Sequence, residues 1–228
     1  MRKRIISGRK SAVMTGALLL AGLVTGLLSV VPVIDGADYL IQSSTNENQV
    51  LIGAFCQLLM VATYIGVPLM LYPILSKHNK GLALGSVAFG IMAGVFIIAG
   101  VILLLLLLAL SHEFTEAGSP NGSYFQTLGE LLRAGRDLVN HVATTLAFVM
   151  AMLLFNSLFY RTQIVPRWLS VSGIAGSALS ISASLLFMIR FIGLDATYMA
   201  LNIPIACQQL VLGLWLIIQG YNRGNGNE

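Results

Sequence analysis

DLVNHVATTLAFVMAMLLFNSLFYRTQIVPRW, residues 137–168, is a long apolar run with polar residues at both ends. It begins with the polar Asp137 and His141, continues through apolar residues and leaves through Arg161. An apolar helix of about 20 residues is long enough to cross the hydrocarbon core of a bilayer. Residues 166–168 then form a turn into a further apolar run. The stretch therefore predicts a membrane span and the tight turn that leads to the next span.

The composition of the whole chain supports this interpretation. Of its 228 residues, 57% are hydrophobic and only 10% are charged, whereas soluble domains carry about 25% charged residues. A water-soluble core of this length could not bury so much apolar surface, so lipid must be the main solvent. The net charge of +4 does not indicate nucleic-acid binding, because the bases are divided among short segments at span ends.

On both sides of residues 137–168, apolar runs alternate with polar segments along the whole chain. The predicted spans cover residues 12–34, 50–75, 81–110, 138–160, 168–189 and 199–220. We therefore predict an all-α polytopic membrane protein with six transmembrane helices. A basic N-terminal segment (residues 1–11) precedes a single transmembrane domain (residues 12–220), and a polar tail (residues 221–228) follows it.

Several details of these spans can be predicted. Pro68 and Pro73 are expected to kink or end the second span, because proline removes a helical hydrogen bond. The leucine run 103–108 is expected to face lipid. Residues 111–123 have the composition of a loop, whereas residues 124–136 have helical spacing of apolar residues. This last segment is either a short interfacial helix or an extension of the fourth span.

The basic residues predict the orientation. The N-terminus, the segments after the second and fourth spans, and the tail hold ten of the 13 Lys and Arg residues. The opposite side holds eight of the nine acidic residues. By the positive-inside rule, both termini are expected to be cytoplasmic, which requires an even number of spans. Tyrosine and tryptophan residues near the predicted span ends agree with this topology.

Two short motifs resemble a known family of bacterial six-span membrane proteins, domain of unknown function 4386. The motifs are the turn between the fourth and fifth spans and the end of the sixth span, and they contain Arg161, Pro166, Arg167, Trp168, Trp215 and Gly220. The resemblance implies a multi-pass protein of the bacterial inner membrane, and it implies no activity. Relatives usually carry an acidic residue six positions before the final tryptophan, where this chain has Gln209.

The polar residues within and beside the spans are candidates for a functional site. The predicted spans contain no Asp, Glu, Lys or Arg, which argues against an ion-coupled transporter or pump. The remaining polar residues gather toward the predicted outer side, and the candidate cluster is Gln57, Asp137, Asn140, His141, Thr144, Arg190, Asn202, Gln208 and Gln209. These residues either line an outward-facing cavity between the second, fourth, fifth and sixth spans or form interhelical hydrogen bonds. We favour the hydrogen bonds.

His141 is the sharpest single candidate, because an imidazole with an ordinary pKa near 6.5 can sense pH or bind a ligand. No ligand spacing typical of a metal site accompanies it, and we predict no metal and no cofactor. Cys56 and Cys207 lie in apolar runs and are expected to be buried thiols. The chain contains neither an HExxH nor a GxSxG motif, so we predict that it is not an enzyme.

Two functions remain open. The first is a non-enzymatic membrane protein with a structural, sensory or interaction role. The second is a binder or transporter of a small molecule or lipid, using the outward-facing cavity. A solvent-accessible pocket lined by His141, Arg190 and Gln209 would favour the second, and a sealed interior would exclude a transport pathway in that state. The sequence does not predict the oligomeric state.

Overall fold

A computed structural model describes residues 2–120 and 124–222, and the protein is 85% helical. In the described part, six helices are long and apolar enough to cross a membrane, which confirms the predicted fold class. The long helices are α1 (Arg2–Leu28), α3 (Glu47–Leu75), α4 (Lys80–Glu116), α6 (Thr145–Thr162), α7 (Arg167–Met188) and α8 (Ala196–Ile218). The shorter helices are η1 (Pro32–Ile34), α2 (Tyr39–Thr45), α5 (Tyr124–Leu138) and the π-helix η2 (Val139–Thr144), which joins α5 to α6.

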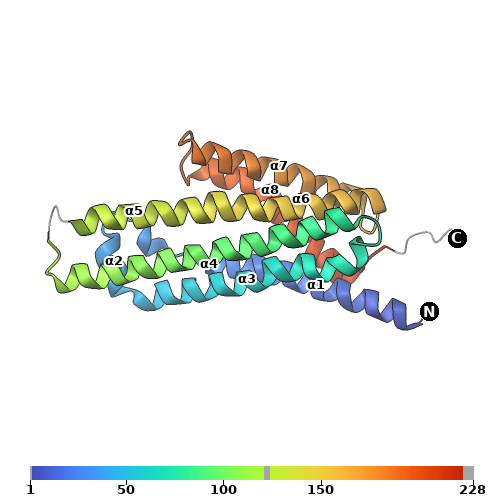
Figure 1. The fold of residues 1–228 in the computed structure, drawn as a ribbon, viewed down its shortest axis with the longest axis horizontal. Coiled ribbons are helices and arrows are strands. Elements are labelled where there is room, and N and C mark those ends of the chain that lie inside the picture. The colour runs from blue at the N-terminus through green and yellow to red at the C-terminus, as the bar shows by residue number, and fades with distance from the viewer. Residues whose placement is uncertain (1, 121–123, 223–228) are drawn as a thin grey trace.

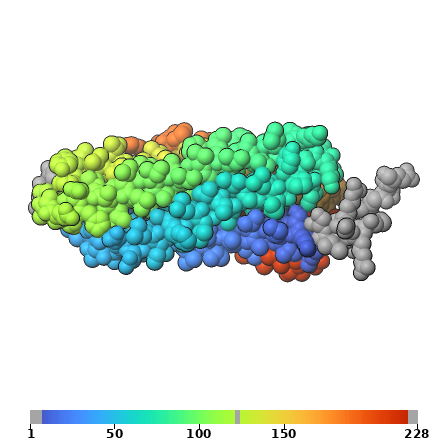
Figure 2. Space-filling view, turned by 60° about the horizontal axis from the view of Figure 1, so that its bottom comes forward, coloured from blue at the N-terminus to red at the C-terminus, as the bar shows by residue number. Residues whose placement is uncertain are grey.

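The spans pack in chain order and the last one closes on the first. Contacts run from α1 to α3, then to α4, α6, α7 and α8, and α8 returns to α1. Figure 2 shows α4, α3 and α1 lying side by side over one face of an elongated bundle. The start of α1 and the end of α8 lie at the same end of the bundle (Figure 1), as an even number of spans requires.

The first span is shorter than predicted at its C-terminal end. α1 ends at Leu28 rather than at residue 34. Pro32 lacks the N–H that would continue the helix and restricts the residue before it. The apolar run therefore continues as an extended residue, Val31, and the short 3₁₀ helix η1. Residues 223–228, most of the predicted tail, lie outside the described residues.

Of the two outcomes expected at Pro68 and Pro73, a kink or an end of the second span, the end does not occur, because α3 continues through both to Leu75. Pro68 cannot donate to the carbonyl of Tyr64, four residues earlier. Gly90 of α4 lies directly against this carbonyl and the Pro68 ring, and a Cβ at Gly90 would overlap both. Close packing of α4 thus covers the backbone that proline leaves without its helical donor.

Two helices extend far beyond the others at the end opposite the termini (Figure 1). α4 has 37 residues, about 55 Å of helix, whereas the hydrocarbon core is about 30 Å thick. Residues 111–116 are helical and not a loop as predicted. α5 is an extension of the fourth span rather than a separate helix.

The extended ends of α4 and α5 pack with α2, and we call these three segments the head. The Tyr39 hydroxyl donates to the carbonyl of Gln126 (3.2 Å), and Phe114 of α4 packs edge-on against Phe125 of α5. Burial, reinforced by nearby Glu130, raises the pKa of Tyr39 above its ordinary value. Leu104, Leu107 and Leu108 are buried here, so the leucine run 103–108 faces lipid only in part.

The core consists of two apolar clusters. The first lies toward the termini and includes Leu71, Phe155, Phe159 and Leu212, all fully buried. The second lies between α2, α3, α4 and α5 in the head. The two clusters fill the ends of the bundle and leave the region between them for polar residues.

The turn that resembles the family motif is built as predicted between the fourth and fifth spans. α6 ends at Thr162 and is capped by Gln163, which has a left-handed backbone (φ 56°), and Pro166 is the residue that precedes the first turn of α7. Arg161 and Trp168 are exposed, and the Arg167 guanidinium lies over the Tyr160 ring (5.8 Å). Trp215 of the second motif is partly buried against the first apolar cluster, and Gly220 has a positive φ of 75°.

Candidate functional site

A cavity of about 590 Å³ lies between the two apolar clusters, where α7 ends and the head begins. Every span contributes to its wall, from Gly26 of α1 to Met199 of α8. Its polar lining comes mainly from α3 and from the segment that runs from α5 through η2 into α6. The lining residues used below are Asp35, Gln57, Tyr64, Arg133, Arg136, Asp137, Asn140, His141, Thr144 and Phe148.

The π-helix η2 forms the centre of the polar wall. A π-turn accommodates one residue more than an α-turn and is frequent at functional sites. Here it contains Asn140, His141 and Thr144, and all of them line the cavity. At the end of η2, the backbone N–H of Thr145 donates to the Val142 carbonyl, and its hydroxyl donates to the carbonyl of Asn140 (3.2 Å).

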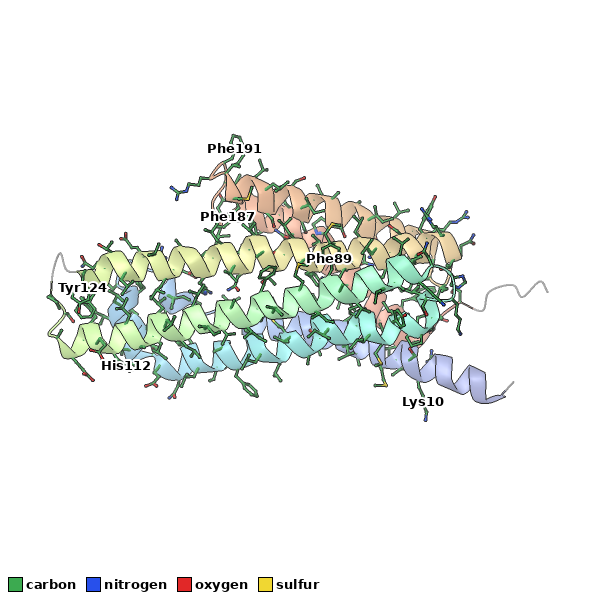
Figure 3. The ribbon with its side chains drawn as sticks, viewed as in Figure 1. Lys10, Phe89, His112, Tyr124, Phe187 and Phe191 are labelled. Carbon is green, nitrogen blue, oxygen red and sulfur yellow. The ribbon has the colours of Figure 1, made fainter. Side chains whose placement is uncertain are left out.

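Two hydroxyl groups from other spans hold η2 in this form. Ser184 of α7 donates to the His141 carbonyl at 2.8 Å, and Tyr198 of α8 donates to the same oxygen at 3.2 Å. The His141 ring packs edge-on against Tyr198 and Phe187, with ring centroids 5.3 and 6.1 Å apart. Figure 3 shows Phe187 between α7 and the long α5–α6 helix, whereas Phe191 points away from the bundle.

Asn140 is held by a notch in α4. A Cβ added at Gly100 would overlap the Asn140 side-chain amide, so only glycine leaves room for it. A glycine in the interior of a helix costs roughly 0.5–1 kcal/mol relative to alanine. Gly100 therefore permits the close approach of α4 and η2 at this point.

Charged residues gather at the head side of the cavity. Arg136 meets Asp137 at 3.0 Å and Asp35 at 3.9 Å, and both carboxylates approach the same nitrogen, Nη1. Arg133, one turn earlier, donates to the carbonyl of Gly36 (3.3 Å) and lies over the Tyr39 ring. The α1–α2 segment that carries Asp35 is therefore tied to α5 by two arginines.

Three buried side chains that line the cavity hold polar atoms without a hydrogen-bond partner among the described residues. They are Gln57 Oε1, Arg136 Nε and Thr144 Oγ1. Each of these residues is more than nine-tenths buried. Leaving a buried polar group unpaired costs about 1–3 kcal/mol. Each such group calls for an explanation, and at a cavity a bound water, an ion or a ligand can supply the missing partner.

The side of the cavity nearer the termini is apolar. Tyr64 of α3 and Phe148 of α6 are stacked there, with ring centroids 4.2 Å apart. Beyond them the fully buried Met152 and Phe155 fill the bundle. The cavity is thus bounded by packed side chains on the side that faces the termini.

Five of the nine residues predicted as a polar cluster line this cavity: Gln57, Asp137, Asn140, His141 and Thr144.

The other four predicted residues lie elsewhere. Arg190 is exposed beyond the end of α7, and Asn202 donates to the Tyr198 carbonyl within its own helix (2.9 Å). Gln208 donates to Asn156 at 3.2 Å, deeper in the bundle. Gln209 lines a separate void of about 20 Å³.

Sequence reasoning left Arg136, Asp35 and Tyr198 out of the cluster. Arg136 precedes Asn140 by four residues, which is the spacing of one helical face, so a signal for it was present. Asp35 and Tyr198 reach the site through tertiary packing, and no local spacing indicates them.

Asp195, next to Leu194 of the cavity wall, caps α8. The Tyr198 backbone N–H, with other backbone N–H groups, lowers the pKa of Asp195.

Both cysteines are free thiols, Cys56 buried and Cys207 exposed, so the expectation of two buried thiols is correct only for Cys56. In the described ranges, no group of three His, Cys, Asp or Glu residues is arranged to hold a metal ion. His112 lies 3.6 Å from Glu47 in the head, away from His141.

Comparison with known proteins identifies the family and no activity. A family model described as a domain of unknown function, DUF4386, matches residues 14–220, so the chain belongs to this family. The resemblance inferred from the two motifs is thereby confirmed. No curated protein and no solved structure matches the chain.

Proposed function

We propose that this protein is a non-enzymatic, ligand-binding membrane protein whose site is the cavity around η2. The observation that carries the proposal is the set of three unpartnered polar atoms on Gln57, Arg136 and Thr144 at one cavity. A volume near 590 Å³ falls within the range of about 300–1,000 Å³ that is typical of small-molecule sites. The mixture of polar and aromatic lining residues is also typical of such sites.

We further infer that the cavity opens toward the outside of a bacterial cell membrane. This orientation rests on the excess of lysine and arginine at the end that carries both termini. The packed cluster of Met152 and Phe155 between the cavity and the terminal end favours binding over passage through the bundle in this state.

Replacing Gln57 by leucine tests the proposal. The variant removes an unpartnered buried acceptor, so unfolding of the ligand-free protein should require the same or more free energy. Binding sites commonly cost stability in this way. Native mass spectrometry of the gently extracted protein should show a retained small molecule in the wild type and much less of it in Gln57→Leu.

Ser170→Ala is the matched control. Ser170 is also fully buried and its hydroxyl also lacks a partner among the described residues, but it lies away from the cavity. The control should gain stability in the same way and retain the ligand. Equal retention by the wild type and Gln57→Leu, or no retained molecule in any of the three proteins, would argue against a binding function.

A further inference from the structure

We propose that the ligand of this cavity is an amphiphile with an oxyanion head, a carboxylate or a phosphate, and an apolar tail. The inference rests on the proposed function, because it names the class of molecule that the same site takes. It is based on the order of side chains along the cavity wall and on the Arg136 guanidinium, whose Nε has no partner among the described residues.

The lining changes character along the α5–η2–α6 helix. Arg133, Arg136 and Asp137 lie at the head end, neutral Asn140 and Thr144 follow, and the aromatic Phe148 comes last. Arg136 and Phe148 are 12 positions apart, which corresponds to about 18 Å along a helix. A single extended cavity that is charged at one end and aromatic at the other matches a molecule with the same division.

Arg136 is the group that selects an oxyanion. Its side chain is only 10% exposed, and its Nε has no partner among the described residues. Both acidic neighbours approach Nη1 instead. A guanidinium group binds carboxylates and phosphates with two parallel N–H donors, and the acidic neighbours contact only Nη1 and leave the buried Nε unpaired.

The acidic residues do not make the site favour a cation. Asp137 is already bonded to Arg136 at 3.0 Å, and the Asp35 side chain is 61% exposed and lies 3.9 Å away. A solvent-exposed ion pair contributes little and is easily exchanged. An entering oxyanion can therefore replace Asp35 at the guanidinium while the contact to Asp137 is kept.

The apolar end accounts for the tail. Tyr64 and Phe148 stack at 4.2 Å and form a flat surface in the cavity wall. Met199 and Phe187 border the cavity from α8 and α7. Burial of apolar surface against such side chains supplies binding free energy that an isolated phosphate ion could not gain.

The test uses the full-length protein in nanodiscs of zwitterionic lipid, with decanoate, decanol and decylamine as probes. Saturable binding is measured by calorimetry against empty nanodiscs. We expect the wild type to bind decanoate at least about tenfold more tightly than decanol, because a hydrogen bond to a charged group is the difference between them.

Arg136→Lys keeps the positive charge but loses the planar group with several donors. This variant should weaken decanoate binding by about 10- to 100-fold and leave decanol binding unchanged. Arg190→Lys is the matched control, since Arg190 is exposed and does not line the cavity. If Arg136→Lys does not fold, Arg136→Gln combined with Asp137→Asn removes the ion pair as a unit and should show the same selective loss.

The outcomes separate the two proposals. No saturable binding of any probe by the wild type would overturn both the binding function and this inference. Equal affinity for decanol and decanoate, tighter binding of decylamine, or a decanoate affinity unaffected by Arg136→Lys would overturn the oxyanion head alone. Native mass spectrometry identifies the source: a retained phospholipid indicates the bilayer, and a retained fatty acid or similar single-chain acid indicates a free amphiphile.

Discussion

Removing the two hydroxyl groups that hold η2 should destabilise the protein more than the sum of the single losses. The His141 carbonyl accepts from Ser184 Oγ at 2.8 Å and from the Tyr198 hydroxyl at 3.2 Å. Ser184→Ala and Tyr198→Phe each delete one donor and leave the other in place. The double variant leaves this carbonyl with neither donor.

The magnitudes follow from the loss of one or both donors to this partly buried oxygen. An interhelical hydrogen bond in a membrane protein contributes about 0.6 kcal/mol on average, so each single variant should lose about that amount. A buried polar group without a partner costs about 1–3 kcal/mol. We therefore expect the double variant to lose about 2–3 kcal/mol, with a coupling energy of about 1 kcal/mol between the two sites.

The assay is a double-mutant cycle of reversible unfolding in mixed detergent micelles. Ser182→Ala serves as the control, because the Ser182 hydroxyl bonds only to Ala178 within α7, at 3.0 Å, on an exposed side. The control should change the free energy of unfolding little and should not couple to Tyr198→Phe. Additive losses of unfolding free energy in the Ser184 and Tyr198 cycle would refute the view that either hydroxyl can partly replace the other as a donor to the His141 carbonyl.

Three further predictions concern other parts of the bundle. Gly100→Ala should cost about 1–3 kcal/mol of unfolding free energy, because the added methyl group overlaps the Asn140 side-chain amide. The control Gly135→Ala has room for the methyl group and should be tolerated. Equal unfolding midpoints for the two variants would contradict the close packing of Asn140 on Gly100. Asn156→Ala should cost about 1–3 kcal/mol in chemical unfolding, because it removes the closer acceptor of the Gln208 amide and leaves only the 3.5 Å contact to the Leu169 carbonyl. Replacing both Asn156 and Gln208 with leucine should recover part of the loss, and a larger loss in the double variant would speak against this pairing. Asp195→Asn should be less stable than the wild type at neutral pH, because the pKa of the Asp195 carboxyl is lowered in the folded protein. The carboxylate therefore contributes its full stability above its unfolded-state pKa, which is near 4, and loses it as the pH falls through its folded-state pKa. Thermal midpoints of the two proteins that stay equally far apart down to about pH 3 would contradict this linkage.

The spans could be predicted because a lipid solvent places a simple condition on them. A helix such as α7 must be apolar over the thickness of the bilayer, and nothing about its partners is needed to find it. The packing beside Pro68 could not be predicted in this way, since Gly90 of another helix covers the carbonyl that the proline leaves without a donor. Whether a proline interrupts a membrane helix depends on what packs beside it.

The cavity could be predicted only in part, for a related reason. Residues on one helix, such as Asp137 and His141, were found by their spacing. The π-helix η2, which places them at the cavity, is held by hydrogen bonds from Ser184 and Tyr198 of other spans, so no local sequence pattern predicts it. Gln209 was misplaced because the rotation of α8 about its own axis is set by packing.

The closure of α8 onto α1 has a consequence for biosynthesis. Arg9 of α1 donates to the carbonyls of Ile217 and Ile218 at the end of α8, and Gly16 lies against the backbone of Gly213. Chains are made from the N-terminus, and the parts made first usually fold first. Here α1 is made well before α8, so one of its sides stays uncovered until α8 arrives. A chain that stalls before α8 should therefore leave this side of α1 exposed to lipid, although α3, α4, α6 and α7 are already made.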